Sequence, residues 1–129
     1  MDTIHNIEEQ RRIDLTRTAL EILDEWGIKP DHQVVLLGLP QDTRPRALAK
    51  YRKGSALPDE EGILLRIHYL LGIHKAVCSL FPHNHMVGQY WITTPTRSFG
   101  GKSPLDIMLR NGISGMQRVQ DHLNGTADW

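Results

Sequence analysis

Residues 59–81 read DEEGILLRIHYLLGIHKAVCSLF, and this stretch decides the fold. One apolar line with alternating spacings of four and three runs along it, formed by Ile63, Ile67, Leu70, His74, Val77 and Phe81. A second line is formed by Leu64, Leu71 and Cys78. A helix that is apolar over so much of its surface is normally central to a fold, which predicts a long central helix over 59–81. Two apolar lines exceed what a small fold easily buries, so we also expect a homodimer built on this helix.

Three shorter helices are predicted before the central one. Apolar spacings of three and four residues indicate a helix over Gln10–Trp26, and a glycine follows as a stop signal. A second helix is expected over Asp31–Leu37. A third is expected over Thr43–Arg52, capped by Asp42 or Thr43. The compact, glycine-containing connection between the second and third helices has the shape of a helix-turn-helix.

The segment after the central helix also predicts short helices. One is expected over Asn84–Ile92, followed by an irregular loop over Thr93–Gly101. Ser103 with Pro104 is a typical helix start, and a last helix over Ile113–Leu123 is expected to end at Asn124-Gly125. No stretch indicates a strand. The predicted fold class is therefore all-α, with a helix-turn-helix-like region (1–57) joined through the central helix to a C-terminal helical region (58–129).

Composition excludes several classes of protein. The 129 residues include 15 Lys+Arg and 15 Asp+Glu, so the net charge is zero, and 40% are hydrophobic. A disordered chain has fewer hydrophobic residues and a larger net charge. No apolar run is long enough for a membrane span, and the polar start is unlike a secretory signal. One cysteine excludes an intrachain disulfide framework and fits a reducing cytoplasm. The charge is uneven, because residues 31–57 hold two acids and five bases.

This basic cluster is a candidate DNA-binding surface. Arg and Lys neutralise phosphates or reach guanine edges, and a Thr hydroxyl can donate to a phosphate. The candidate DNA-binding residues are Thr43, Arg44, Arg46, Lys50, Arg52 and Lys53. The alternative is a solvated basic face on a helix that packs through Leu48, and these residues alone leave both interpretations open.

Metal binding and catalysis have little support in the sequence. His74 and Cys78 lie four residues apart and share a helix face, but zinc sites need three or four ligands and no CxxC or HExxH is present. A hydrogen-bonded core histidine is the commoner explanation for His74. No nucleophile motif or phosphate-binding glycine loop is present. We therefore expect no enzyme activity, no metal and no cofactor.

Several short motifs together resemble a known family. They are Leu65–Ile67, Leu70–Ile73, Lys75-Ala76, Leu80–Pro82, Trp91-Ile92, Pro95, Phe99–Ser103, Leu105-Asp106, Met108-Leu109, Val119, Leu123 and Trp129. This pattern, with its FGGKS core, is similar to antitoxins of the Xre/MbcA/ParS family, in the branch paired with RES-domain toxins. Trp26-Gly27, Leu36–Gly38 and the basic helix resemble that family's Xre-like helix-turn-helix region.

The resemblance implies an all-helical, dimeric type II antitoxin that neutralises a RES-type, NAD-consuming toxin encoded beside it. It also implies repression of the operon's own promoter. The expected toxin-binding residues are Phe99, Gly100, Gly101, Asn124, Gly125, Asp128 and Trp129. A tail freed from the last helix by Asn124-Gly125 is expected to reach the toxin's nucleotide site, where the Asp128 carboxylate, the terminal carboxylate and the Trp129 indole would imitate a dinucleotide. The alternative function is a helix-turn-helix regulator without a toxin partner.

Overall fold

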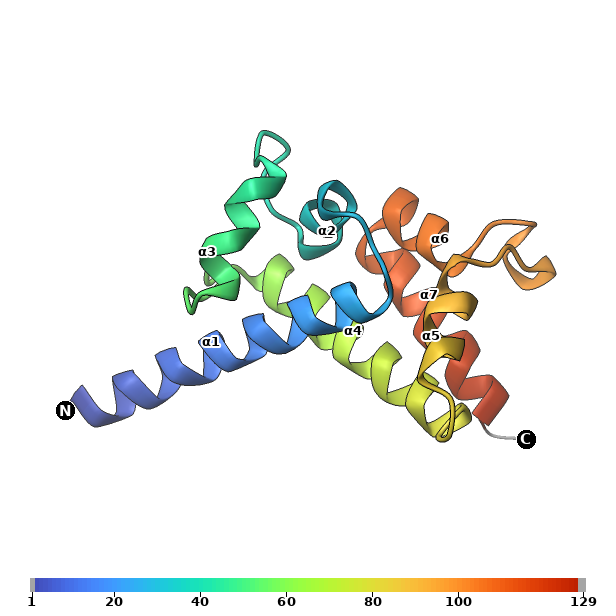
Figure 1. Ribbon diagram of the computed structural model, residues 1–129, viewed down its shortest axis with the longest axis horizontal. Coiled ribbons are helices and arrows are strands. Elements are labelled where there is room, and N and C mark those ends of the chain that lie inside the picture. Colours follow the sequence, from blue (N-terminus) through green and yellow to red (C-terminus); the bar gives the residue numbers. More distant parts are fainter. Residues whose placement is uncertain (1, 128–129) are drawn as a thin grey trace.

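The computed structural model describes residues 2–127, which form seven α-helices and two short 3-10 helices without a β-strand (Figure 1). The elements are α1 (Asp2–Glu25), α2 (Pro30–Leu37), η1 (Pro45–Ala47), α3 (Leu48–Arg52), α4 (Glu61–Leu80), α5 (His85–Thr93), η2 (Arg97–Phe99), α6 (Pro104–Asn111) and α7 (Ile113–Ala127). The all-α prediction is confirmed.

Helix α4 lies in the middle of the molecule and contacts helices of both the N-terminal and the C-terminal group, and α2 also contacts α6 directly (Figure 1). Helix α1 crosses it, and α2 and α3 lie on the same side as α1. Helix α7 packs along α4, and α6 packs against α7. The buried apolar residues form one cluster that extends from Ala19 on α1 to Leu123 on α7.

The two apolar lines of α4 have different surroundings. Ile63, Leu70 and Val77 of the first line are buried in the core. In the second line Leu64 is 37% exposed and Cys78 is also exposed. One face of α4 therefore builds the core, and the other leaves apolar surface in contact with solvent.

The third helix differs from its prediction over Thr43–Arg52. It begins with the 3-10 turn η1 at Pro45, and Arg44 is the residue before it, with extended backbone angles (φ −80°, ψ 142°). A residue before proline is sterically disfavoured in the helical region, so Arg44 cannot continue a helix backward. Thr43 and Asp42 therefore precede the helix without capping it.

Both terminal helices are longer than predicted. Helix α1 begins at Asp2, eight residues before Gln10, because strong helix formers such as Glu and Arg extend it without apolar spacing. Helix α7 continues through Ala127, so the predicted end at Asn124-Gly125 is wrong. A glycine inside a helix costs only about 1 kcal/mol relative to alanine, which is too little to stop a helix that is already formed. The chain after residue 124 is thus not a free tail but is helical at least to Ala127.

Helix α4 is long and apolar enough to cross a membrane by length and composition alone. The central helix of a globular protein passes the same test, and α4 has α1 and α7 packed against it. One such helix is weak evidence for a membrane protein.

Candidate functional site

The predicted DNA-binding residues gather on the surface of η1 and α3. Helix α3 is fixed to the core by Leu48 and Tyr51, which are 0% and 7% exposed. Its basic side chains therefore face solvent. Lys50 of α3 lines an open groove of about 580 Å³, together with Arg46 of η1 and with Thr43 and Arg44 of the preceding turn.

Lys50 and Lys53 have different positions on this surface. Lys50 is exposed, and its Nζ atom lies 5.1 Å from the centre of the Tyr51 ring. Lys53 is exposed and follows the last residue of α3. Both ammonium groups are therefore available to an anionic partner such as a phosphate.

Arg52 forms an ion pair and hydrogen bonds with residues of α1 and α2. Its Nη2 atom lies 2.8 Å from Asp24 Oδ1 and donates a hydrogen bond to Gln33 Oε1 at 2.9 Å. Gln33 is buried and also donates to Asp24 Oδ1 and to the carbonyl oxygen of Ile28. Arg52 thus joins α3 to α1 and α2, which is a structural role.

The contacts with Arg52 and Gln33 lower the pKa of the Asp24 carboxyl group. Burial raises its pKa, but hydrogen bonds from Arg52 and Gln33 and the positive charge of Arg52 outweigh burial, so the pKa is lower than usual. Asp24 therefore stays ionised near neutral pH and keeps Arg52 in place.

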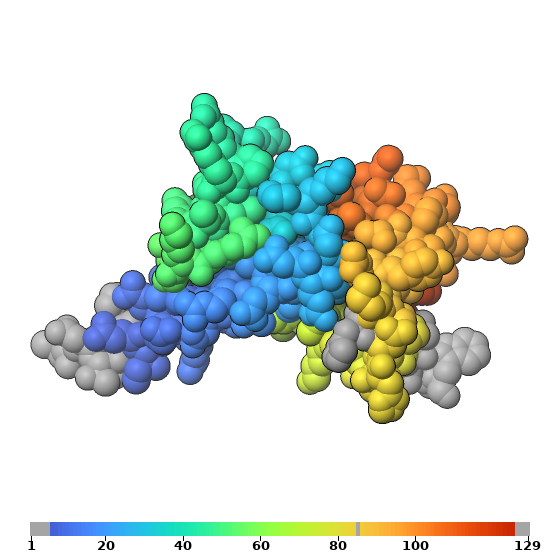
Figure 2. All heavy atoms as spheres, in the orientation of Figure 1, coloured from blue at the N-terminus to red at the C-terminus, as the bar shows by residue number. Residues whose placement is uncertain are grey.

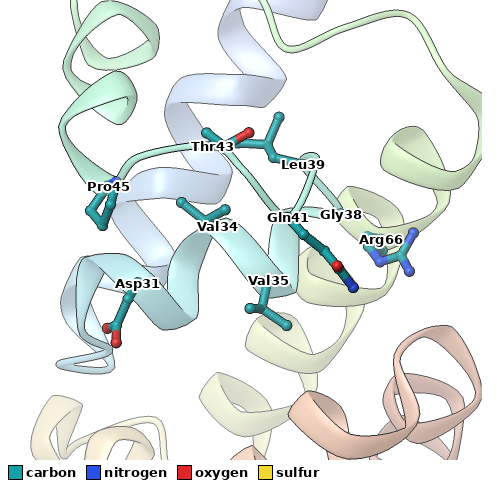
Figure 3. A pocket seen from close by; sticks show the side chains of 9 residues that line it. All are labelled: Asp31, Val34, Val35, Gly38, Leu39, Gln41, Thr43, Pro45 and Arg66. Atoms are coloured by element: carbon teal, nitrogen blue, oxygen red, sulfur yellow. The ribbon is translucent and has the colours of Figure 1, made fainter.

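A second groove, of about 410 Å³, lies between α2 and the segment that leads to η1 (Figure 3). Val34 and Val35 lie on its α2 side, while Asp31 and Arg66 lie toward opposite ends. Thr43 lines both grooves, so they adjoin at the turn between α2 and η1. The surface of this turn is thus hollowed on either side of Thr43.

The guanidinium group of Arg66 occupies a niche between glycines of three different elements. A Cβ atom built on Gly38 would lie 2.8 Å from its Nη1 atom, one on Gly62 3.2 Å from Nη1, and one on Gly112 3.5 Å from Nη2. Gly38 ends α2 and Gly112 follows α6, both with a positive φ. Arg66 belongs to the Leu65–Ile67 motif of the sequence, which gives it no role, and in the structure its side chain reaches from the end of α2 to the junction of α6 and α7.

The glycine loop of residues 96–102 has a defined backbone. Thr96 N donates to the carbonyl oxygen of Lys102 at 3.1 Å, and Gly101 N donates to that of Thr96 at 2.9 Å. Gly100 and Gly101 have φ values of 66° and 84°, which only glycine adopts readily. Both are exposed, and a Cβ atom added to either would meet no atom within 4 Å. The loop projects from the surface at the right of Figure 2.

Phe99 holds this loop on the molecule. Its side chain is 3% exposed, so the structure places it inside and not on a docking surface. Its ring lies 5.1 Å from that of His122, edge to face, and 5.2 Å from the Arg118 guanidinium. Trp91 stacks on the other side of this cluster, 6.3 Å from His122. The buried ring explains how the two exposed glycines keep their position.

A basic cleft of about 510 Å³ lies between this loop, α6 and α7. Lys102, Arg110 and Arg118 line it, and none of its described lining residues is acidic. The Arg118 Nη2 atom also donates to the carbonyl oxygen of Ser98 at 3.3 Å. These three cations are spaced eight residues apart, on the loop, α6 and α7, and the fold brings them to one cleft.

The last predicted toxin contacts lie at the end of α7. Asn124 and Gly125 are exposed within the helix. Asp128 and Trp129 lie outside the described residues. The described toxin contacts thus lie on two elements, the glycine loop and the last turn of α7.

His74 and Cys78, four residues apart on α4, form a small polar cluster with Glu25 of α1. His74 Nε2 lies 3.0 Å from Glu25 Oε2 and 3.7 Å from Cys78 Sγ. The prediction of a hydrogen-bonded histidine is confirmed, although its side chain is 29% exposed and lies at the edge of the core. Within the described part of the chain, no group of three His, Cys, Asp or Glu side chains is placed to hold a metal ion.

A comparison with protein families bears on the C-terminal half of this structure. Residues 79–127, from the end of α4 to the end of α7, match the family described as the antitoxin Xre/MbcA/ParS C-terminal toxin-binding domain. The match supports this antitoxin family and indicates, in general, an antitoxin that binds a toxin. No curated protein matches the chain.

Proposed function

We propose that this chain is the antitoxin of a type II toxin-antitoxin system and neutralises a RES-type, NAD-consuming toxin. The observation that carries the proposal is the toxin-binding family match over residues 79–127. That segment contains the exposed glycine loop and the basic cleft, two features suited to a polypeptide partner. The RES branch rests on the resemblance carried by the FGGKS motif at 99–103.

The toxin contacts divide between two surfaces of this segment. Gly100 and Gly101 supply exposed backbone that a partner can approach closely, since no side chain covers it. Asn124 and Gly125, followed by Asp128 and Trp129, supply contacts at the end of α7. A pocket that takes a dinucleotide needs cationic donors for the pyrophosphate, and a carboxylate beside an indole suits such a pocket.

The same chain also represses its own promoter in this proposal. One hydroxyl and three cations line the groove of η1 and α3, from Thr43, Arg44, Arg46 and Lys50. Lys53 adds a fourth exposed cation just after α3. One such surface makes few phosphate contacts, so useful affinity for DNA needs two such surfaces.

A homodimer provides the second DNA-binding surface. The exposed apolar face of α4, with Leu64 and Leu65 each 37% exposed, is its proposed interface. A reducing cytoplasm, where the promoter and the toxin's substrate are both present, is the proposed location. Light scattering at micromolar concentration tests the dimer, and a monomeric mass contradicts it.

Co-expression tests the main proposal. The reading frame beside this chain's gene is expected to encode a RES-domain protein, which is expressed alone and together with this chain while growth and cellular NAD are measured. We expect growth arrest and NAD loss with the RES-domain protein alone, and relief of both by this chain. Promoter binding without any effect on growth or NAD would instead favour the alternative, a helix-turn-helix regulator without a toxin partner.

A further inference from the structure

Helix α5 carries the most exposed large apolar side chains of the described part of the chain. Met86 is 69% and Tyr90 is 71% exposed. They are four residues apart, so they lie on the same face of the helix. Phe81, 38% exposed, lies just before the helix. Helix α5 itself lies at the molecular surface (yellow in Figure 2).

The packing of α5 fixes which face points outward. Gly88 is buried, and a Cβ atom on it would lie 3.1 Å from Val77 Cγ1 and 3.7 Å from Trp26 Nε1. Ile92, four residues later, is 0% exposed. The side of α5 that contains Gly88 and Ile92 therefore packs against the core. Since two residues correspond to about 200° around a helix, positions 86 and 90 must face away from it.

The helix that carries this outward face has no Asp, Glu, Lys or Arg between residues 86 and 93 that would favour its exposure to solvent. Residues 86–93 read MVGQYWIT. Exposed tyrosine and methionine are enriched in protein interfaces, where charged residues are depleted from the centre. Exposed apolar patches of this kind on soluble proteins mark interaction sites.

We infer that the face formed by Met86 and Tyr90 is the apolar centre of the surface that binds the toxin polypeptide, an inference that rests on the proposed function. Both residues, and the exposed Phe81 before the helix, lie within the segment 79–127 that matches the toxin-binding domain. The other exposed large apolar side chains of the described chain lie outside that segment, namely Ile7, Val35, Leu64 and Leu65. The toxin is thus the occupant of α5, and a second copy of this chain occupies α4.

Alanine variants measure the contribution of this face. The Kd for the purified neighbouring RES-domain protein is measured by calorimetry for the unmodified chain, Tyr90→Ala, Met86→Ala and the double variant. Truncation of central interface residues commonly weakens binding at least tenfold, so we expect about tenfold or more for Tyr90→Ala and roughly 100-fold for the double variant. Val35→Ala is the matched control, since Val35 is 50% exposed and outside the matched segment. Its Kd should stay within about twofold of the unmodified chain, as for an energetically neutral surface position.

The outcomes separate this inference from the proposed function. If the unmodified chain does not bind the RES-domain protein, both are overturned. If it binds and the double variant binds equally well, the inference is overturned and the proposed function stands. If the double variant binds equally well and becomes monomeric by light scattering, α5 is a self-association face, which also overturns the inference.

A second measurement needs no substitution and therefore no assumption about folding. Met86 is exposed and should be oxidised readily to the sulfoxide by dilute peroxide. Saturation with the RES-domain protein should slow this oxidation at least severalfold by peptide mass spectrometry. Buried Met116, 0% exposed, serves as the internal reference and should be slow in both states. Equal oxidation of Met86 in the free and bound chain overturns the inference.

Discussion

Replacement of Gly115 by alanine should destabilise the protein even though it removes a glycine from a helix. A Cβ atom at position 115 would lie 2.3 Å from the carbonyl oxygen of Ile107 and 3.0 Å from its carbonyl carbon. Carbon and oxygen atoms approach closely at about 3.3–3.6 Å, so α6 and α7 would have to separate by about 1 Å. The obstacle is backbone, which cannot rotate aside as a side chain can.

The expected magnitude follows from two opposing effects. Alanine gains about 1 kcal/mol over glycine in helix propensity. Overpacking costs about 1–3 kcal/mol, and the upper end applies here because α6 backbone is rigid. The net loss of unfolding free energy is therefore about 2 kcal/mol. With about 2.1 cal/mol/K of unfolding entropy per residue, this lowers Tm by roughly 7 °C.

The same helix offers a matched control for the experiment. Gly125 also lies within α7, but no atom lies within 4 Å of a Cβ position there. Gly125→Ala should therefore keep the propensity gain of about 1 kcal/mol and raise Tm by about 4 °C. Thermal unfolding of both variants is followed by circular dichroism at one protein concentration. A Tm for Gly115→Ala that equals or exceeds that of the unmodified chain would refute the packing argument.

Three further predictions concern the cap of α6, the Asp24–Arg52 pair and the basic groove. Ser103 accepts a hydrogen bond from the backbone of the first turn of α6 in a capping box, so Ser103→Ala should cost about 1 kcal/mol, measured by urea unfolding. The pKa of Asp24 is lower in the folded than in the unfolded chain, so its ionised carboxylate stabilises the fold at pH values above the ordinary carboxyl pKa of about 4. This stabilisation is lost as the pH falls through the lower pKa of the folded chain. Asp24→Asn should therefore flatten the acid side of the stability profile, by less than about 1 kcal/mol because the pair is partly exposed. Combined Arg46→Ala and Lys50→Ala should weaken promoter binding and reduce its salt dependence by about two units of slope per surface, whereas an unchanged gel shift would remove both residues from the DNA interface.

Local signals in the sequence predict most helix positions. The Ser103-Pro104 start of α6 and the apolar spacing of α4 are determined by nearby residues, and the structure has both helices within two residues of the prediction. The start of η1 differs from its prediction because the steric effect of Pro45 on Arg44 outweighs the capping preference of Thr43. The end of α7 differs because Asn124-Gly125 is a weak stop signal without a left-handed residue.

The candidate site is harder to predict, because it depends on which residues the fold brings together. Phe99 is apolar and lies beside exposed glycines, but only the packing of α7 shows that its ring is buried. The basic side chain of Arg52 resembles its neighbours in the sequence, and only the position of Asp24 on α1 gives it a structural role. The outward face of α5 likewise depends on Gly88 meeting Val77, a contact across 11 positions of sequence.

The niche around Arg66 limits how antitoxins of this design can recombine. Its guanidinium contacts the end of α2 on one side and the α6–α7 junction on the other, at Gly38 and Gly112. An N-terminal half taken from a relative with a bulkier residue at position 38 would push this side chain toward the C-terminal half. Exchange of whole halves between relatives therefore requires that the two glycines and the arginine are exchanged together. Surface substitutions on α3 or α5 leave this niche intact, so they should be tolerated more readily than recombination at the boundary between the halves.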